Sequence, residues 1–282
     1  MQLKPIFLWG ILLSISSTLP AQTIQDIWSK MGYAMASIKT ATYEMSTQER
    51  IDGALFQKKT AFRLQTNPLK VYGKNQTTGV EFLYVTGWNN GKIHINPNGF
   101  PWVLLNLDPL SPQVRKNSHH TTYHAGFGYM LTMFKDVERK ILAKGLKLEN
   151  CISNKGTIVW NNRACYHIEI HAPSYQWITH TCTQNESLNA LCDRMNILEY
   201  AVMEANKLDY AAQVTKGQQI KIPNFMAKKI VLYVDKENYL PIVQRIYDDK
   251  GLFEEYEYRN LSLKPTLQAG EWTAQCAGYG FK

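Results

Sequence analysis

Three histidines lie close together near the middle of the chain, His119, His120 and His124. His120 and His124 are four residues apart, a spacing that places two imidazoles on one face of a helix, where they can bind a metal ion. The segment has no HExxH pattern, and the nearest carboxylates in the sequence are Asp108 and Asp136. The pattern therefore favours histidines that hydrogen-bond loop backbone or line the mouth of a cavity, and no metal site is predicted.

The loop that carries these histidines is the best candidate for a ligand-binding mouth in the main part of the chain. It combines a guanidinium group, an amide and two imidazoles in a short stretch, and such groups can orient a bound molecule. The candidate residues of this cavity mouth are Arg115, Asn117, His119 and His120.

Catalytic signatures are absent from the sequence. There is no GxSxG motif for a serine nucleophile, and the spacing of cysteine, serine and histidine residues alone does not define a catalytic pair. Glu49 and Arg50, at the end of a predicted strand, are interpreted as an ordinary surface ion pair, and a buried functional arginine is the alternative. Tyr256 and Tyr258, two residues apart, are interpreted as one packed face of a strand. The sequence thus predicts a protein that is not an enzyme and uses no cofactor.

The five cysteines are Cys151, Cys165, Cys182, Cys192 and Cys276, and their odd number leaves at least one thiol unpaired within a monomer. A disulfide between Cys182 and Cys192 would close a short loop and contribute about 3 kcal/mol. Cys151 and Cys165 form the other candidate pair. Buried free thiols are the alternative for both pairs, and the absence of a CxxC motif makes a zinc site unexpected.

The composition favours a folded, basic protein with a substantial core. Of the 282 residues, 45% are hydrophobic, and the formal net charge is +8. The basic residues come in short pairs spread along the chain, whereas a nucleic-acid-binding protein would cluster them. We therefore expect no nucleic-acid partner. Peripheral contact with anionic envelope polymers or lipid surfaces is the alternative to plain solvated basic surface.

The first 21 residues are typical of a secretory signal. Lys4 supplies the positive charge, Ile6–Ile15 forms an apolar core, and Leu19–Ala21 is a cleavable end. The apolar run is shorter than the roughly 18 residues of a membrane-spanning helix. We expect the mature chain to begin near Gln22, to be soluble and exported, and to reside in the periplasm of a Gram-negative bacterium.

The rest of the sequence alternates between predicted helices and strands. Apolar residues at spacings of three and four predict one helix between Ile24 and Ile38 and another between Phe127 and Ile141. Strand-like runs bounded by turn residues fill most of the remainder, and Pro101–Ser118 reads as a loop. The predicted strands are Ala41–Arg50, Ala54–Thr66, Leu69–Lys74, Val80–Thr86, Lys92–Asn96, Leu146–Cys151, Thr157–Trp160, Arg163–Ala172, Ala227–Asp235, Tyr239–Asp248 and Leu252–Leu263.

Residues 173–223 interrupt this pattern and resemble a LysM module, a small βααβ unit that binds N-acetylglucosamine polymers. Gln176–Thr183 corresponds to the opening strand, Asn185–Leu188 to the corner before the first helix, and Gly217–Pro223 to the closing strand. Between them, apolar residues recur at helical spacing. Asn185 stands where the family usually has Gly, a substitution that a left-handed backbone tolerates. The alternative is a helical insertion whose ending matches the family by chance.

The LysM resemblance implies a shallow sugar-binding groove between the corner and the loop after the second helix. Backbone groups there would match acetamido groups, and Leu208 or Tyr210 would cover the N-acetyl methyl or a ring face. A groove of this kind implies weak affinity, on the order of 10 μM to 1 mM. The residues implied in glycan binding are Thr183, Gln184, Asn185, Glu186, Ser187, Asn206, Lys207, Leu208, Asp209 and Tyr210.

The sequence on either side of this module resembles the LolA/LolB-like fold, an incomplete antiparallel β-barrel that wraps around helices and encloses an apolar cavity. This resemblance, to uncharacterised exported bacterial proteins, implies an α+β fold and a cavity for a lipid or a lipoprotein acyl chain. Because the ends of a LysM module lie close together, residues 163–172 and 227–235 are predicted to pair as neighbouring strands. The segments that carry the resemblance are Glu49–Gly53, Glu81–Val85, Asn96–Pro101, Arg115–His120, Asp248–Glu254 and Tyr279–Phe281.

Four segments are thus predicted: an export signal at 1–21, a LolA-like host at 22–172, a LysM-like insertion at 173–223, and the last part of the host at 224–282. The leading functional prediction is a non-catalytic envelope protein that holds a lipid or acyl ligand in its cavity and contacts peptidoglycan. The alternative is an exported cell-wall hydrolase. Its signature would be two converging carboxylates about 5–10 Å apart in the cavity.

Overall fold

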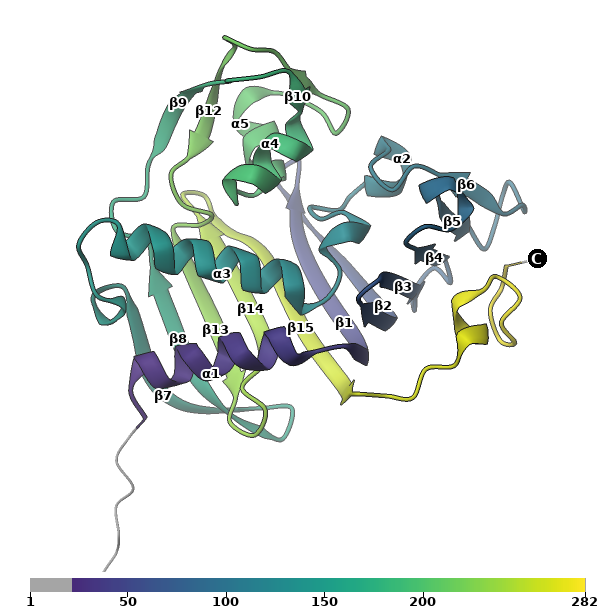
Figure 1. The fold of residues 1–282 in the computed structure, drawn as a ribbon, viewed down its shortest axis with the longest axis horizontal. Helices are drawn as coiled ribbons and strands as arrows, with labels where there is room; N and C mark the ends of the chain where they lie inside the picture. Colours follow the sequence, from purple (N-terminus) through teal and green to yellow (C-terminus); the bar gives the residue numbers. More distant parts are fainter. Residues whose placement is uncertain (1–21, 282) are drawn as a thin grey trace, which may run out of the picture.

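The computed structural model describes residues 22–281, so the predicted export signal at residues 1–21 lies outside the described residues. One antiparallel sheet of eleven strands forms the body of the protein (Figure 1). Its strands are β1 (Thr40–Ile51), β2 (Ala54–Thr66), β3 (Leu69–Asn75), β4 (Glu81–Val85), β5 (Ile93–Asn96), β6 (Leu105–Leu107), β7 (Ile152–Trp160), β8 (Arg163–His171), β13 (Lys229–Asp235), β14 (Pro241–Asp248) and β15 (Gly251–Leu263).

The strand order makes the sheet an open barrel. The order is β6-β5-β4-β3-β2-β1-β15-β14-β13-β8-β7, so β6 and β7 lie at the two edges and do not pair with each other. The strand after the inserted segment returns to the strand before it, since β13 pairs with β8, as predicted. Asp248 and Gly251 face each other across the predicted β14–β15 turn. The predicted α+β fold with an incomplete antiparallel barrel is confirmed.

Two long helices cover the sheet on its inner side (Figure 1). The first begins at a capping box in which the Thr23 hydroxyl accepts from the Asp26 amide. Both helices bury one apolar face, and they meet where Trp28 packs on Phe134, with ring centroids 5.6 Å apart. The helices are α1 (Ile24–Ser37), α2 (Pro112–Arg115), α3 (Phe127–Leu142), α4 (Leu188–Met195) and α5 (Glu199–Asn206), and the 3-10 turns are η1 (Asn89–Gly91), η2 (Thr122–His124), η3 (Leu148–Asn150) and η4 (Ala269–Trp272).

Two sequence-based expectations for local structure were wrong. Residues 146–151 contain the turn η3 and are not a strand, because the Asn150 side chain accepts from the Lys147 amide and the Asn150 amide donates to the Lys147 carbonyl. The segment predicted as a loop at 101–118 contains the short strand β6 and the helix α2. Neither change alters the order of the longer strands.

Residues 173–223, called the inserted unit below, contain a strand, two helices and a strand in that order. The outer strands β9 (Trp177–Thr181) and β12 (Gln219–Pro223) pair antiparallel, and α4 and α5 lie between them in the sequence. A second, shorter pair joins β10 (Glu186–Ser187) to β11 (Gln213–Val214). The ends of the unit are therefore adjacent, which lets it extend from the β8–β13 pair without interrupting the sheet (Figure 1).

The inserted unit shares its hydrophobic core with the rest of the protein. Buried residues of α4, α5 and β12 belong to the same continuous cluster as those of α1, α3 and the large sheet. A smaller second cluster, around Tyr72 and Trp272, fixes the C-terminal segment against β3 and β4. The unit is thus packed onto the sheet through an apolar contact rather than held by its two connections alone.

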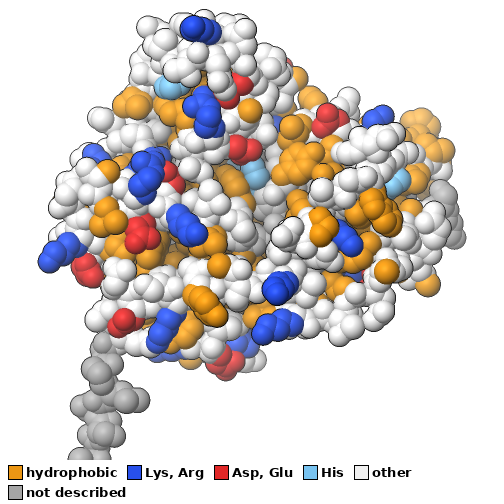
Figure 2. All heavy atoms as spheres, viewed as in Figure 1, with side chains coloured by type: hydrophobic (Ala, Val, Ile, Leu, Met, Phe, Trp, Pro, Cys, Tyr) orange, Lys and Arg blue, Asp and Glu red, His pale blue; other side chains and the backbone are white. Residues whose placement is uncertain are grey.

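All five cysteines are free thiols in the structure, and four of them are buried. Burial raises the pKa of the Cys165 thiol to about 11, with a smaller contribution from the charge of Asp235. Lys and Arg side chains are scattered over the face seen in Figure 2 and do not gather in one patch there. Within residues 22–281, no helix combines the length and the apolar character needed to cross a bilayer.

Candidate functional site

A cavity of about 420 Å³ lies between the inner face of the sheet and α3. This volume is within the usual range of small-molecule sites. Its walls come from β1 to β5, β14 and β15, from α3, and from the loop of residues 113–126. The hydrophobic lining residues include Tyr43, Met45, Phe62, Val71, Phe82, Ile93, Ile95, Met130, Met133, Phe134 and Tyr258.

The cavity changes from apolar to polar along the paired strands β1 and β15. Met45 lies opposite Tyr258, the next inward pair is Thr47 with Tyr256, and the last is Glu49 with Glu254. All lie on the same side of the sheet, because side chains two residues apart on a strand share a face. The polar end carries Glu49, His119, His120, Glu254 and Tyr256, which are called the polar cluster below.

Glu49 and Glu254 are directly opposite each other on neighbouring strands and are both almost completely buried. Like charges in this position destabilise a sheet, and a buried carboxylate needs charged or hydrogen-bonding partners. Tyr256 donates its hydroxyl to Glu49 at 2.7 Å, and the Lys58 ammonium lies 3.6 Å from the other oxygen of Glu49. These contacts compensate part of the buried negative charge.

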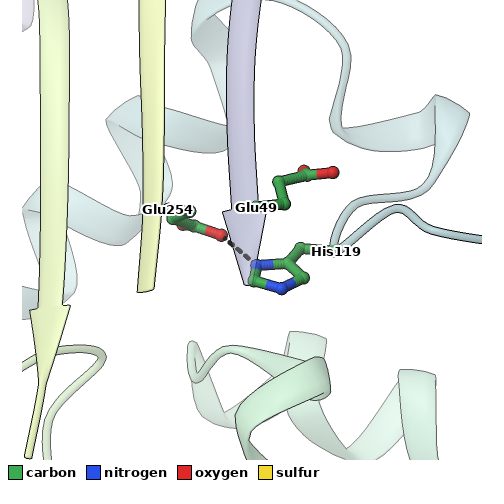
Figure 3. Close-up of side chains that lie close together, drawn as sticks. All are labelled: Glu49, His119 and Glu254. Atoms are coloured by element: carbon green, nitrogen blue, oxygen red, sulfur yellow. Dashed lines mark hydrogen bonds and ion pairs between the residues drawn. The ribbon is translucent and has the colours of Figure 1, made fainter. Parts of the chain in front are cut away.

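His119 faces Glu254 directly (Figure 3). Its Nδ1 lies 2.8 Å from the Glu254 Oε2, and its Nε2 lies 3.0 Å from the carbonyl oxygen of Arg50. The ring stacks between Phe253 and Tyr200, with centroid distances of 4.3 and 4.5 Å. Because both faces and both nitrogens have partners, the orientation of this imidazole is fixed.

His120 and Glu254 shift the pKa values of each other. Burial raises the pKa of the Glu254 carboxyl, but the charge of His120 and the hydrogen bonds of both histidines outweigh it, so the pKa ends far below its ordinary value. Burial lowers the pKa of His120, but the charge and hydrogen bond of Glu254 outweigh it, so the pKa ends above its ordinary value. Glu254 is therefore ionised, and His120 keeps its proton to a higher pH than an ordinary histidine.

The inserted unit supports the loop that supplies the histidines. Arg115 forms a buried, two-pronged ion pair with Glu199 on α5, and its guanidinium lies 4.6 Å from the Tyr210 ring centroid. The Tyr210 hydroxyl donates to the Ser118 carbonyl at 3.0 Å. Tyr200, also on α5, supplies one of the two rings that stack on His119. The polar cluster is therefore built jointly by the sheet, this loop and the inserted unit.

The four residues predicted at the cavity mouth lie in different surroundings. Arg115 and His120 line the cavity. His119 is buried behind its wall, between two aromatic rings. Asn117 does not line the cavity; it has a left-handed backbone, and its carbonyl accepts from Lys58. The histidine pair considered in the sequence is also close, since the Nδ1 atoms of His120 and His124 are 3.4 Å apart.

The ten residues implied in glycan binding belong to two stretches of the inserted unit. In the corner, Thr183, Gln184 and Asn185 are exposed, and the Asn185 side chain accepts from the Lys216 amide. The half-buried Glu186 pairs with Arg194, and the Ser187 hydroxyl caps α4. In the second stretch, Lys207 and Asp209 are exposed, Asn206 bonds to the Lys221 backbone, and Leu208 and Tyr210 are half-buried.

The sequence-based interpretation missed Glu49 and Glu254. The expected surface ion pair between Glu49 and Arg50 was wrong: both are buried, and Arg50 instead pairs with Asp248. The interpretation of Tyr256 and Tyr258 as one packed strand face was confirmed, since both are buried in the cavity wall. One signal pointed to the carboxylates. Glu49 continues the inward-facing series Tyr43, Met45, Thr47, and Glu254 begins the inward-facing series that the two tyrosines continue.

Several solved structures show a low similarity to this chain. The Mycobacterium tuberculosis lipoprotein LppX has 10% identity and a TM-score of 0.40, with 87% of this chain and 99% of that chain covered. LprF from Mycobacterium bovis has 11% identity and a TM-score of 0.41, with 86% and 94% covered. A LolA superfamily protein from Nitrosomonas europaea has 10% identity and a TM-score of 0.33, with 90% and 98% covered. These scores are low, and the fold assignment rests on the strand order of the chain itself.

No curated protein matches the sequence. One family profile does, that of the family described as "Protein of unknown function (DUF1571)", and the match spans residues 38–184. It includes Glu49, the histidine loop and the start of the inserted unit. The matched segment makes up just over half of the 282 residues, and the chain therefore belongs to the DUF1571 family.

Proposed function

We propose that the protein is a non-catalytic binding protein whose cavity holds a lipid or another molecule with an acyl chain. The observation that carries this proposal is the gradient along β1 and β15, from Met45 and Tyr258 at the apolar end to the paired carboxylates at the polar end. An amphiphile fits such a cavity with its chain against the apolar walls. Its polar group would then lie near Arg115 and His120.

The apolar part of the cavity is large enough to make this binding favourable. Burying about ten methylene groups contributes roughly 8 kcal/mol, from which the costs of immobilising the ligand are subtracted. Polar groups on the walls can orient the other end. The buried Thr47 and Thr121 hydroxyls, the Gln244 amide nitrogen and the Arg115 Nε have no hydrogen-bond partner within the described residues. All four can donate a hydrogen bond, so they suit a head group rich in acceptor oxygens.

Displacement of a fluorescent fatty acid from the purified, delipidated protein tests this proposal. Met45→Trp should reduce the affinity for the probe at least tenfold, because the new ring would occupy the middle of the cavity. Val159→Trp is the matched control, since Val159 is exposed on β7 and does not line the cavity. Wild-type protein that does not bind the probe, or equal binding by both variants, would contradict the proposal.

The alternative function, hydrolysis of cell-wall polymers, would require two catalytic carboxyl groups, and Glu49 and Glu254 are the candidate pair. One oxygen of Glu49 and one of Glu254 lie within 4.8 Å of each other, and both residues line the cavity. Glycoside hydrolysis needs one of two carboxyls to have a raised pKa so that it can donate a proton. The pKa of Glu254 is lowered instead, and its Oε2 atom is already in contact with the Nδ1 atom of His119. Glu254 therefore does not suit the proton-donating role of such a pair.

We also propose that the inserted unit contacts N-acetylglucosamine-containing glycan of the cell wall, which requires the exported, periplasmic location expected from residues 1–21. The antiparallel β9–β12 pair enclosing two helices supports this proposal, as do the exposed corner residues Thr183 to Asn185. The contact with the Ser118 carbonyl turns the Tyr210 hydroxyl toward the host. The sugar would therefore lie against the corner, Lys207 and Asp209.

Solution NMR with N-acetylglucosamine oligomers and soluble peptidoglycan fragments tests the glycan contact. Amide signals of residues 183–187 and 206–210 should shift at millimolar ligand, while those of β14 should not. An Asp209→Ala and Gln184→Ala double variant should reduce the shifts, because both side chains offer hydrogen bonds at the surface. Unchanged spectra at saturating ligand would rule out the contact and leave the lipid proposal untouched.

A further inference from the structure

Three side chains of the polar cluster can act together as metal ligands. One ligand atom each of Glu49, His119 and Glu254 lies within 4.8 Å of the other two, and all three residues are buried (Figure 3). Two carboxylates and one imidazole form a donor set that suits a divalent transition metal such as Zn²⁺. Mg²⁺ and Ca²⁺, by contrast, favour oxygen ligands alone.

The hydrogen bonds of His119 determine which nitrogen faces the carboxylates. The Arg50 carbonyl can only accept, so the Nε2 atom of His119, 3.0 Å away, carries a hydrogen. In a neutral ring, the lone pair of Nδ1 is then directed at the Glu254 Oε2, 2.8 Å away. Two lone pairs at this distance repel unless a proton or a metal ion lies between them. A ring N–H bonded to a backbone carbonyl is also the common outer contact of a metal-bound histidine.

The strand register provides an independent reason to expect a cation. Glu49 and Glu254 are directly opposite each other and buried, an arrangement that costs free energy without positive charge between them. The Thr47 hydroxyl, two residues before Glu49 on the same face, is buried, lines the cavity and has no hydrogen-bond partner among residues 22–281. A water molecule bound to the metal could supply that partner. The Tyr256 hydroxyl already bonds to Glu49, as outer partners of ligating carboxylates do.

We propose that Glu49, His119 and Glu254 bind a divalent transition-metal ion of the Zn²⁺ class at the polar end of the cavity. Tetrahedral ligand atoms at about 2.0–2.1 Å from the metal are about 3.4 Å from one another. The Nδ1 atom of His119 and the Oε2 atom of Glu254 therefore need to separate by about half an ångström, which rotation of the Glu254 carboxylate can supply while the imidazole stays in place. Both carboxylates line the cavity, so it provides the entry path and faces the remaining coordination position. This site does not depend on the identity of the hydrophobic ligand.

Calorimetric titration of the EDTA-treated protein with Zn²⁺ tests the metal site. One ion should bind per chain, and Co²⁺ in its place should give visible absorption bands typical of nitrogen and oxygen ligands. Glu254→Gln, Glu49→Gln and His119→Gln should each weaken binding at least tenfold, since even the loss of an outer contact costs about 10- to 100-fold. Circular dichroism of each variant establishes that it is folded. If one variant fails to fold, the other two decide.

Two control variants separate this site from other histidine clusters. His124→Gln alters the neighbouring His120–His124 pair, and Glu169→Gln alters a half-buried glutamate that contacts the exposed His171 on β8. Both should bind Zn²⁺ like the wild type. Loss of binding in His124→Gln with binding kept in Glu254→Gln would overturn the proposal, because the ion would then lie on His120 and His124. The absence of saturable 1:1 binding by the wild type would also overturn it.

Discussion

Two groups of glutamate and histidine side chains lie on the same sheet in opposite surroundings. On β1 and β15, Glu49 and Glu254 face the cavity and are buried with His119. On β8, Glu169 bonds to Lys229 at 3.0 Å and to His171 at 3.3 Å, at the solvent side of the sheet. The residue types are the same, but only the first group is desolvated, held by aromatic stacking and open to a cavity. Residue type alone therefore does not distinguish a binding site from an ordinary surface cluster.

Burial changes what each contact contributes to stability. The lowered pKa of Glu169 comes mainly from its hydrogen bond with Lys229, a contact that solvent and salt screen. Glu254 has no exposed surface, and its histidine partners must first overcome the cost of desolvation. Removing a partner from the buried group should therefore have a much larger effect than the same change at the surface.

The largest difference is expected for two arginines that pair with glutamates of the inserted unit. Arg115 and Glu199 are almost fully buried, whereas the Arg194 side chain, which pairs with Glu186, is 45% exposed. Arg115→Met should lower the free energy of unfolding by about 3–5 kcal/mol, because it leaves Glu199 charged and buried. Arg194→Met should cost less than about 1 kcal/mol. Urea denaturation at neutral pH measures both values.

The double variant Arg115→Met with Glu199→Met is the control for this prediction. It removes both charges, so it should recover most of the stability that the single change loses. Equal stability of Arg115→Met and Arg194→Met would mean that the ion pair between Arg115 of the histidine loop and Glu199 of the inserted unit does not form in solution.

The second prediction compares the two glutamates directly. Glu254→Gln should lower the free energy of unfolding of the metal-free protein by about 2–3 kcal/mol, because it weakens charged hydrogen bonds to two histidines. Glu169→Gln should cost less than about 1 kcal/mol, since its partners remain solvated. Chemical denaturation in the presence of EDTA measures this difference. A larger loss from Glu169→Gln would reverse the ranking of the two groups.

The third prediction tests the contribution of a single hydroxyl to the polar cluster. Tyr256→Phe removes the donor that lies 2.7 Å from Glu49 and should cost about 1.5 kcal/mol, the lower end of the range for a bond to a charged group. Tyr33→Phe is the matched control, because the Tyr33 side chain is 79% exposed and should tolerate the change. Thermal unfolding monitored by circular dichroism compares the two. If both variants match the wild type, Glu49 does not depend on this hydroxyl.

Much of the fold could be predicted from local sequence, because turn residues such as Asp52-Gly53 and Asn67-Pro68 separate most of the strand-like runs. The run at 146–151 was the exception, since the Asn150 side chain favours a turn over a strand. The histidine loop could also be identified as a candidate mouth from its composition. How deeply this loop is buried could not be predicted, because the burial of His119 depends on Tyr200 and Phe253, which are distant in the sequence.

The carboxylate pair could not be predicted because it depends on strand register. Glu49 and Glu254 are more than 200 residues apart, and only the pairing of β1 with β15 makes them neighbours. A shift of one residue would have directed one of them to the other face of the sheet. A carboxylate that continues an apolar alternation is nevertheless a signal that can be read in advance. Glu49, after Met45 and Thr47, fits this description.

The smallest expected effect is a pH dependence at the contact between the histidine loop and the inserted unit. The nearly buried His124 faces His120, Tyr129 on α3, and Asp193 and Glu199 on the inserted unit, and its Nε2 lies 3.0 Å from an Asp193 oxygen. Burial lowers its pKa, the Asp193 hydrogen bond opposes this, the charge of His120 lowers it further, and the net shift is downward. The folded protein therefore takes up this proton at a lower pH than the unfolded chain.

The sign of the stability change follows from this difference. The contribution of His124 is fully present above the ordinary histidine pKa of about 6.5 and is lost as the pH falls through the lower pKa of the folded state. His120, whose pKa is raised, acts in the opposite direction and loses its contribution as the pH rises. Comparing wild type with His124→Gln isolates the first contribution. Between pH 7 and pH 5, the wild type should lose more stability than the variant. Parallel curves for wild type and His124→Gln would contradict the lowered pKa of this imidazole at the contact.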